Sequence, residues 1–212
     1  MSHRYNKEED MSSVVVDVVP MMMSSITRHY PVSQEGWQMA EMNADAVLLV
    51  TSWLHQAQIR AYISGGWGID ALLGYQTRAH ADLDVAFDAN TDHQVMQLFG
   101  AAGYTLREDA RPVRFVLSNE SNHVIDFHPV VFDQAGIGIQ QGFEGVYRYP
   151  AHDLIQGTVA GVAVPCISVQ LQIHFHAGYR PTEKDCADMQ VLHHAFGVTL
   201  PASYVDCAGN RN

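Results

Sequence analysis

The chain has 212 residues, which is enough for one large domain or two small ones with a substantial core. Apolar residues make up 47% of it and charged residues 17%, a globular rather than a disordered composition. Its 23 acidic and 12 basic side chains give a formal net charge of −11, which argues against a duplex nucleic-acid binder and is compatible with an amine-bearing ligand.

The N-terminal part contains one apolar patch, residues 14–23, which Asp17 and Pro20 interrupt. Acidic residues precede it, unlike the basic residues of a secretory signal, and no apolar run in the chain approaches the roughly 18 residues of a membrane span. Three cysteines without C-x-x-C spacing predict neither a disulfide framework nor a zinc site. We therefore expect a cytoplasmic protein that binds no membrane, with residues 1–34 as a loosely ordered extension.

From residue 35 onward, the periodicity of apolar residues predicts alternating helices and strands. Thr91 is expected to be the N-cap of one helix, and Gly74 and Gly103 are expected to end two of them. The predicted elements of this half are, in order, a helix over 35–59, a strand over 61–64, a helix over 67–74, a strand over 82–87, a helix over 91–103, and strands over 114–119 and 123–132.

The second half begins with a glycine-rich loop over 136–145, and short strands are expected within 147–167. The pattern then becomes helical, with Thr182 placed three residues before Asp185 as in a capping box. The order of elements predicts an α+β fold, a mixed sheet with flanking helices. We divide it into a domain over 35–167 and a C-terminal helical segment over 168–212.

Two aspartates lie one residue apart on a predicted strand. Because alternate residues of a strand point to the same face, Asp82 and Asp84 project together while Leu83 and Val85 project into the core. Adjacent carboxylates repel each other unless a cation lies between them or one is protonated. Mg²⁺, a hard ion that takes oxygen ligands, suits such a pair. The alternative is a pair of solvated aspartates on an edge strand.

A third aspartate lies on the strand HVIDFHP, where Val124, Asp126 and His128 share one face. If this strand lies beside the first, Asp126 faces the same metal or accepts a proton from a hydroxyl held there. An acid on such an apolar strand is costly to bury unless it is paired or coordinated. The alternative is a partly exposed aspartate on an edge.

The residues Ser64, Gly65 and Gly66 form a strand-to-helix turn upstream of these aspartates. Two glycines before a helix allow backbone N–H groups to approach an anion closely, and the serine adds a hydroxyl. Together with the carboxylates, the turn predicts a phosphate cradle that faces a two-metal site. Phosphoryl and nucleotidyl transfer require this arrangement.

The stretches GGWGIDALLG and TRAHADLDVAF resemble the G-G-W-x-x-D and R-x-H-x-D-[LI]-D motifs of antibiotic nucleotidyltransferases in the polymerase-β-like superfamily. The likeness spans roughly residues 62–192. The aminoglycoside 2''-nucleotidyltransferases share the first block and the third aspartate but match the later blocks less well. The later blocks follow the order of the small lincosamide nucleotidyltransferases; they are PVRF, IDFHPV, FEGVYRY, VPCIS and FHAGYRPTEKDCAD.

This resemblance implies roles for individual residues. Asp82 and Asp84 would bind Mg²⁺, as two ions, and Asp126 would be a general base with metal contact nearby, or a metal ligand. The triphosphate of ATP or another NTP would be held by Ser64, Gly65, Gly66, Arg78 and Arg114. For each arginine, an ion pair with Asp70 or another acid is the alternative. His80 would support another site residue or be exposed, with a phosphate contact as the alternative, and Trp67 would pack in the core or stack on a ligand. The antibiotic would contact Glu144, Tyr147, His176 and Tyr179.

The resemblance therefore implies transfer of a nucleoside monophosphate to a lincosamide hydroxyl, with release of pyrophosphate and inactivation of the drug. The alternatives are an aminoglycoside 2''-nucleotidyltransferase, a hydrolase that uses the same metals, and a non-catalytic binding protein of the same fold. The presence of all three aspartates argues against the last. The expected partners are an antibiotic and a nucleotide, both small molecules, and a homodimer is left open.

Overall fold

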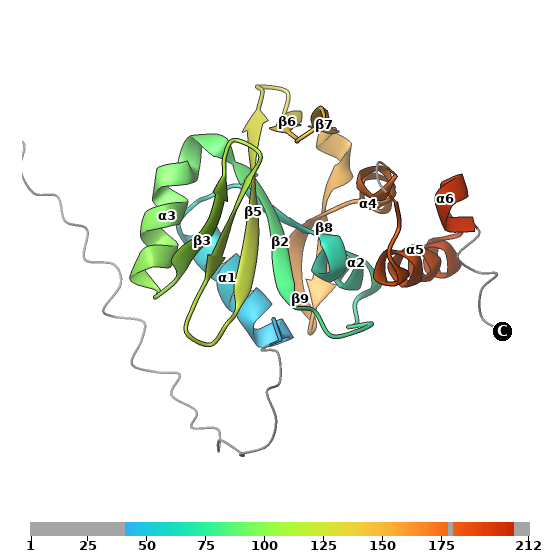
Figure 1. The fold of residues 1–212 in the computed structure, drawn as a ribbon, viewed down its shortest axis with the longest axis horizontal. Coiled ribbons are helices and arrows are strands. Elements are labelled where there is room, and N and C mark those ends of the chain that lie inside the picture. The colour runs from blue at the N-terminus through green and yellow to red at the C-terminus, as the bar shows by residue number, and fades with distance from the viewer. Residues whose placement is uncertain (1–40, 178–179, 206–212) are drawn as a thin grey trace, which may run out of the picture. The chain divides into compact units, whose positions relative to one another are not determined.

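The computed structural model describes residues 41–177 and 180–205 (Figure 1). The expected extension over 1–34 and Tyr179 therefore lie outside the described residues. The elements are, in order, α1 (Ala44–Gln56), β1 (Ala61–Ser64), α2 (Gly65–Leu73), β2 (Asp82–Asp88), η1 (Ala89–Thr91), α3 (Asp92–Ala101), β3 (Thr105–Ala110), β4 (Arg114–Ser118), β5 (Val124–Phe132), β6 (Gly138–Gln141), β7 (Val146–Tyr149), η2 (Ala151–Asp153), β8 (Leu154–Val159), β9 (Val162–Ile167), α4 (Val169–His176), α5 (Glu183–Phe196) and α6 (Ala202–Val205).

The strands of the described residues form one sheet in the order β3-β4-β5-β2-β1-β9-β8, and the β6–β7 hairpin continues from β5 (Figure 1). β2 pairs with β5 in parallel, as β1 does with β9, and the other pairs are antiparallel. A sheet of this kind with flanking helices confirms the predicted α+β class. It also places β2, the strand of the two aspartates, between β1 and β5.

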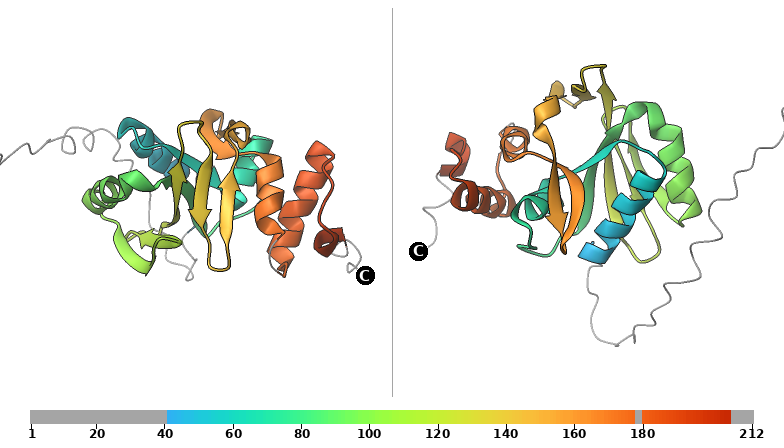
Figure 2. Two further views of the ribbon diagram at one scale, coloured as in Figure 1. Left: turned by 90° about the horizontal axis from the view of Figure 1, so that it is seen from above. Right: turned by 180° about the vertical axis from the view of Figure 1, so that it is seen from behind.

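Strand alternation separates a core face from a polar face on β2. Leu83, Val85 and Phe87 are fully buried and pack with apolar side chains of α1 and α3. Asp82 and Asp84 therefore project to the opposite face. Seen from behind, α1 lies in front of the sheet, whereas α2 lies in front of it in the first view (Figures 1 and 2). The two aspartates thus lie on the side of the sheet that carries α2.

The C-terminal helices pack against α2. Ile69 of α2 forms an apolar cluster with Met189 and Leu192 of α5. The start of α5 has the predicted capping box, in which Thr182 and Asp185 each accept a hydrogen bond from the other's backbone. This packing places α5 beside both α2 and α4.

Most predicted elements of the described residues are confirmed, but three differ. The helix predicted over 35–59 begins at Ala44, where the side chain of Asn43 caps it, and ends at Gln56, because Gln58 adopts a positive φ of 57°. The loop predicted over 136–145 contains β6, whose buried residues are a glycine and a glutamine rather than apolar side chains. β3 was not predicted because its residues are nearly all exposed and carry no alternating pattern.

Two further observations concern the sequence-based expectations about compartment. Cys186 on α5 is disulfide-bonded, contrary to the expectation from cysteine count and spacing. No helix of the described residues is both long enough and apolar enough to cross a membrane.

Candidate active site

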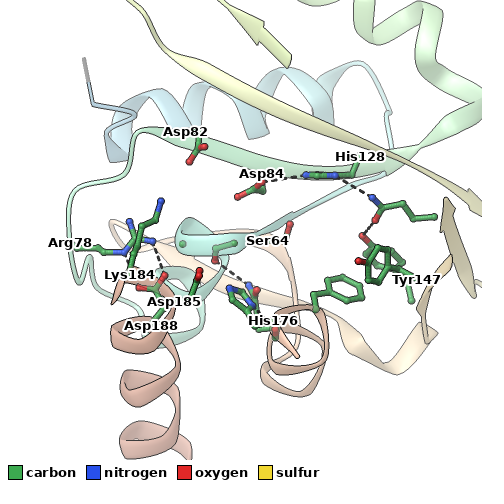
Figure 3. Close-up of a pocket in the computed structure, with 16 residues that line it drawn as sticks. Ser64, Arg78, Asp82, Asp84, His128, Tyr147, His176, Lys184, Asp185 and Asp188 are labelled. Carbon is green, nitrogen blue, oxygen red and sulfur yellow. Dashed lines mark hydrogen bonds and ion pairs between the residues drawn. The ribbon is translucent and has the colours of Figure 1, made fainter. Parts of the chain in front are cut away.

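A cavity of about 340 Å³ opens on the polar face of the sheet, between the ends of β1 and β2 and the helices α4 and α5 (Figure 3). Its walls come from five regions: the turn into α2, the loop between α2 and β2, the strands β2 and β5, the β6–β7 hairpin, and the helices α4 and α5. The lining residues are Ser64, Gly65, Gly66, Arg78, Asp82, Asp84, His128, Gln140, Tyr147, Tyr149, Gln172, Phe175, His176, Lys184, Asp185 and Asp188.

The strand register places the predicted motifs side by side. Asp84 lies opposite Ser64 on β1 and opposite Asp126 on β5. The strands β1, β2 and β5, which contain the three motifs, therefore lie side by side at Asp84. The conditional expectation that the third aspartate lies on a strand beside the first pair is confirmed.

The glycines of the turn are required by close contacts. Gly65 has a positive φ of 58°, and a Cβ atom there would run into Oδ2 of Asp84. A Cβ atom at Gly66 would lie 2.7 Å from Nη2 of Arg78 and would also meet the ring of His80. Ser64 is the N-cap residue of α2, but its side chain makes no capping hydrogen bond. Ser64 and the first two residues of α2 therefore line the cavity beside Asp84, and helix geometry leaves the first N–H groups of α2 without partners inside the helix.

Asp84, Asp126 and His128 form a group that could hold a metal ion, with one ligand atom of each within 4.8 Å of the others. Oδ1 of Asp126 is buried and has no hydrogen-bond partner. A buried orphan acceptor beside a second carboxylate fits a site for a cation. Asp82 lines the same cavity but is not part of this group, so the structure brings together two of the three predicted metal ligands.

The two aspartates of β2 have opposite pKa shifts. Burial and the neighbouring Asp84 raise the pKa of Asp82 above its ordinary value of 3.8. Burial also acts to raise the pKa of Asp84, but a hydrogen bond from His128 and the charge of that ring outweigh it, so the pKa is lowered. Burial raises the pKa of Asp126 as well, against the effects of His128 and Arg114.

These shifts predict that the metal-free Asp82→Asn variant is more stable than the wild type at about pH 7.5. A carboxyl group whose pKa is raised by folding costs stability when it is ionised, and that cost vanishes below the ordinary pKa of 3.8, where folded and unfolded chains are both protonated. We expect a gain on the order of 0.5–1 kcal/mol, or about 1–4 °C in the unfolding temperature. Thermal unfolding with a chelator from pH 7.5 down to pH 3.5 measures it. An equal gain at all pH values would contradict the electrostatic cause.

Both predicted phosphate-binding arginines form ion pairs. Arg78 makes a bidentate pair with Asp188 of α5, with N···O distances of 2.8 and 2.7 Å, and it lines the cavity. Arg114 pairs with Asp126 and with Glu108, and it is not among the lining residues. The alternative of a local ion pair is therefore observed for both, although with acids other than Asp70.

His80 and Trp67 pack beside the turn, and the ring of His80 lies next to Gly66. Nε2 of His80 hydrogen-bonds Oδ2 of Asp70, whose Oδ1 accepts from the N–H and hydroxyl of Thr77 at 3.0 and 2.6 Å. The ring of His80 lies beside that of Trp67, and both are buried. Trp67 donates to the carbonyl of Met42 at 2.9 Å. Of the alternatives for these residues, His80 is buried rather than exposed, and Trp67 packs in the core.

Comparison with known proteins identifies the family. A family model described as aminoglycoside-2''-adenylyltransferase matches residues 46–192, more than half of the chain. The chain belongs to the aminoglycoside-2''-adenylyltransferase family. A lincosamide resistance protein of Staphylococcus haemolyticus is 34% identical over 136 residues, which cover 64% of this chain and 84% of that protein.

Solved structures agree with this assignment. The lincosamide antibiotic adenylyltransferase LnuA, bound to lincomycin, matches with a TM-score of 0.66 at 29% identity, covering 72% of this chain and 97% of that one. ANT(2'')-Ia in complex with adenylyl-2''-tobramycin matches with a TM-score of 0.62, covering 78% and 95%, and at 19% identity it shows the shared fold alone. The family assignment makes the chain a nucleotidyltransferase and confirms the resemblance inferred from its motifs.

Of the residues predicted to contact the acceptor, some line the cavity and one does not. Tyr147 and His176 line the cavity, whereas Glu144 is exposed on the β6–β7 turn and does not. Sequence reasoning missed several lining residues of the hairpin and of α5, among them Gln140 and Lys184. For α5 a signal was present, because Lys184 and Asp188 are four residues apart and so share one helix face.

Proposed function

We propose that the protein transfers a nucleoside monophosphate from ATP or another NTP to a hydroxyl of a lincosamide antibiotic, releases pyrophosphate and so inactivates the drug. The observation that carries the proposal is the position of Asp84. Its carboxylate packs directly against Gly65 at the start of α2, and Asp126 lies opposite it on β5. An anion-binding turn and a carboxylate site therefore face one cavity. The relatives named above support the choice of acceptor.

Asp84 and Asp126 would hold Mg²⁺, with Asp82 supplying a further oxygen on the same face, and a two-ion site is our expectation. The bound metal would neutralise charge on the reacting phosphates. Oxygen atoms are the ligands that Mg²⁺ prefers, and Oδ1 of Asp126 is a buried oxygen that accepts no hydrogen bond, with the ring of His128 3.7 Å away.

The triphosphate would lie against Ser64 and the first N–H groups of α2. Arg78 lines the cavity beside Gly66, and Lys184 enters it from the first turn of α5. The pairing of Arg78 with Asp188 fixes the guanidinium in place and links the loop between α2 and β2 to α5. We propose that these two cations offset phosphate charge, and that Arg114 instead positions Asp126.

Asp126 would act through Oδ1. Its Oδ2 is held by Arg114, and the residue is not among those that line the cavity. A buried oxygen next to Asp84 is placed to bind the metal rather than to touch the hydroxyl of a bulky acceptor. We therefore propose a metal-ligand role, whereas the position of the strand in the sequence had favoured a general base.

The acceptor would contact the aromatic wall of the cavity. The ring of Phe175 lies edge-on to those of Tyr147 and Tyr149, with centroids 5.3 and 5.0 Å away. The acids of the opposite wall are already engaged, because Asp188 pairs with Arg78 and Asp185 accepts from Thr182. An aminoglycoside carries several amines that need free carboxylates, so these contacts favour a lincosamide.

The test is incubation of the protein with Mg²⁺, ATP and a panel of antibiotics, followed by mass spectrometry of the drugs. We expect an AMP adduct of lincomycin and clindamycin, and none of kanamycin. Turnover of kanamycin without turnover of lincomycin would reverse the ranking of acceptors. Release of orthophosphate without an adduct would contradict nucleotidyl transfer and indicate a hydrolase. Because the reaction consumes ATP, we propose that it occurs in the cytoplasm.

A further inference from the structure

The polar side chain of Gln172, on α4, is buried against the turn into α2. Only 1% of its surface is exposed, and it lines the cavity together with Gly65 and Gly66. Its Nε2 donates a hydrogen bond to the backbone carbonyl of Gly65, the first residue of α2, at 3.3 Å. Because a carbonyl oxygen only accepts, this contact also fixes which way the amide is turned. One side chain of α4 thus holds the backbone of the turn.

The contact with the carbonyl of Gly65 also sets the direction of the next N–H group. The carbonyl oxygen of one residue and the amide hydrogen of the next lie on opposite sides of a planar trans peptide. Gly65 has no side chain to restrain its backbone angles, so a partner for its carbonyl restricts the rotation of this peptide plane. The N–H group concerned belongs to Gly66, which lines the cavity.

The start of α4 is fixed to the rest of the protein, so Gln172 has a rigid support. Ser168, the N-cap residue of α4, donates its hydroxyl to Oδ1 of Asp153 at 2.6 Å and accepts from the N–H of Leu171 at 3.2 Å. Leu171 is buried in an apolar cluster with residues of β2, β5 and β9. The position of Gln172 is therefore set by packing against the sheet and does not depend on a ligand.

Gly68, inside α2, leaves the room that the amide of Gln172 needs. A Cβ atom at this position would lie 2.3 Å from Nε2 of Gln172 and 3.1 Å from the carbonyl oxygen of Ile63. Glycine in a helix interior is less stable than alanine, so a glycine here is unfavourable for α2 by itself. A side chain at position 68 would displace the amide from the turn.

We propose that Gln172 is a positioning residue for the triphosphate, because it holds the peptide between Gly65 and Gly66 in one orientation. The inference deepens the proposed function and rests on its nucleotide-binding turn. Phe175 and His176 lie three and four residues further along α4 and line the same cavity. Loss of the Gln172 amide alone should therefore weaken the binding of the nucleotide and spare the antibiotic, whereas displacement of the whole helix would weaken both.

The experiment is isothermal titration calorimetry of the full-length protein with ATP and Mg²⁺. Gln172→Met keeps the length of the side chain but removes the donor. We expect the dissociation constant of ATP to rise roughly 3–10-fold, which is the range for the loss of one ordinary hydrogen bond. Gln170→Met is the matched control, since it makes the same change on an exposed side chain of the same helix. An unchanged dissociation constant in Gln172→Met would overturn the inference.

Steady-state kinetics of AMP transfer separate a positioning role from a purely structural one. In Gln172→Met we expect the KM of ATP to rise by a similar factor while the KM of lincomycin stays at the wild-type value. An equal rise in both KM values would contradict the positioning role and assign Gln172 to the packing of α4.

Gly68→Ala tests the same contact without replacing Gln172. The added methyl group displaces the amide, so we expect the affinity for ATP to fall by a similar factor. In a protein that already carries Gln172→Ala the methyl group has room, and Gly68→Ala should then have little further effect. Equal effects in the two backgrounds would show that Gly68 acts through the backbone of Ile63 and would contradict the role of the amide.

The calorimetric measurements need no turnover, so the two proposals can fail separately. If the wild type binds ATP, Gln172→Met weakens that binding and no antibiotic adduct forms, the proposed function alone is refuted. If Gln172→Met forms the adduct and binds ATP as the wild type does, the positioning role alone is refuted. A wild type that binds no ATP would refute both.

Discussion

Asp84→Asn is expected to lower the rate of adduct formation by roughly 10³-fold or more, while the protein remains folded. Asp84 lies at the centre of the site, between the turn into α2 and Asp126, and its surroundings lower the pKa of its carboxyl group. Loss of charge stabilisation on the reacting phosphates is worth several kcal/mol, and about 4 kcal/mol corresponds to that factor in rate. The measurement is the steady-state rate of AMP transfer with Mg²⁺ at saturation.

Asp88→Asn is the matched control for this prediction. It makes the same chemical change on the same strand and the same face, but outside the cavity. Asparagine at position 84 can still accept the hydrogen bond from His128, so the circular dichroism spectrum and cooperative unfolding should be retained. If Asp84→Asn unfolded, or if it kept most of its activity, the aspartate would be structural or dispensable and the metal assignment would be wrong.

Asp126→Asn is expected to be strongly impaired at low Mg²⁺ and largely restored at high Mg²⁺. The substitution removes the negative charge at Oδ1, which is buried and accepts no hydrogen bond, and leaves Arg114 paired with Glu108. We expect Mg²⁺ affinity to fall by at least about 100-fold. The measurement is the rate of transfer across a Mg²⁺ titration, with nucleotide binding followed in parallel.

The titration separates the two roles that have been considered for Asp126. A general base contributes on the order of 10²–10⁴ in rate, and that loss persists at any metal concentration. A low plateau with normal nucleotide binding would therefore contradict the ligand role and restore the general base. Glu108→Gln serves as a control, since it removes the other partner of Arg114 without changing Asp126.

Features set by neighbouring residues could be predicted from the sequence. Strand alternation alone places Asp82 and Asp84 on one face, because the side-chain period of a strand does not depend on what packs around it. The capping box of Thr182 and Asp185 is similarly local, because both partners lie within one turn. The turn at Gly65 was predicted for the same reason, since glycine is the residue that readily adopts the positive φ found there.

Features that join distant segments were decided by the tertiary structure. The partner of Arg78 is an acid 110 residues away, and the packing of α5 against α2 selects it. The neighbours of Asp84 depend on the register of β2 with β5, since a shift by one residue would turn the carboxylate of Asp126 to the other face. The contact of His128 with Gln140 depends on a hairpin whose glycines and exposed side chains had predicted a loop. Local spacing determined which chemical groups this protein presents on each face of a helix or strand. The pairing of strands and the packing of helices determined which of those groups meet. The physical reason is that spacing fixes the direction of a side chain but carries no information about the segment that will face it.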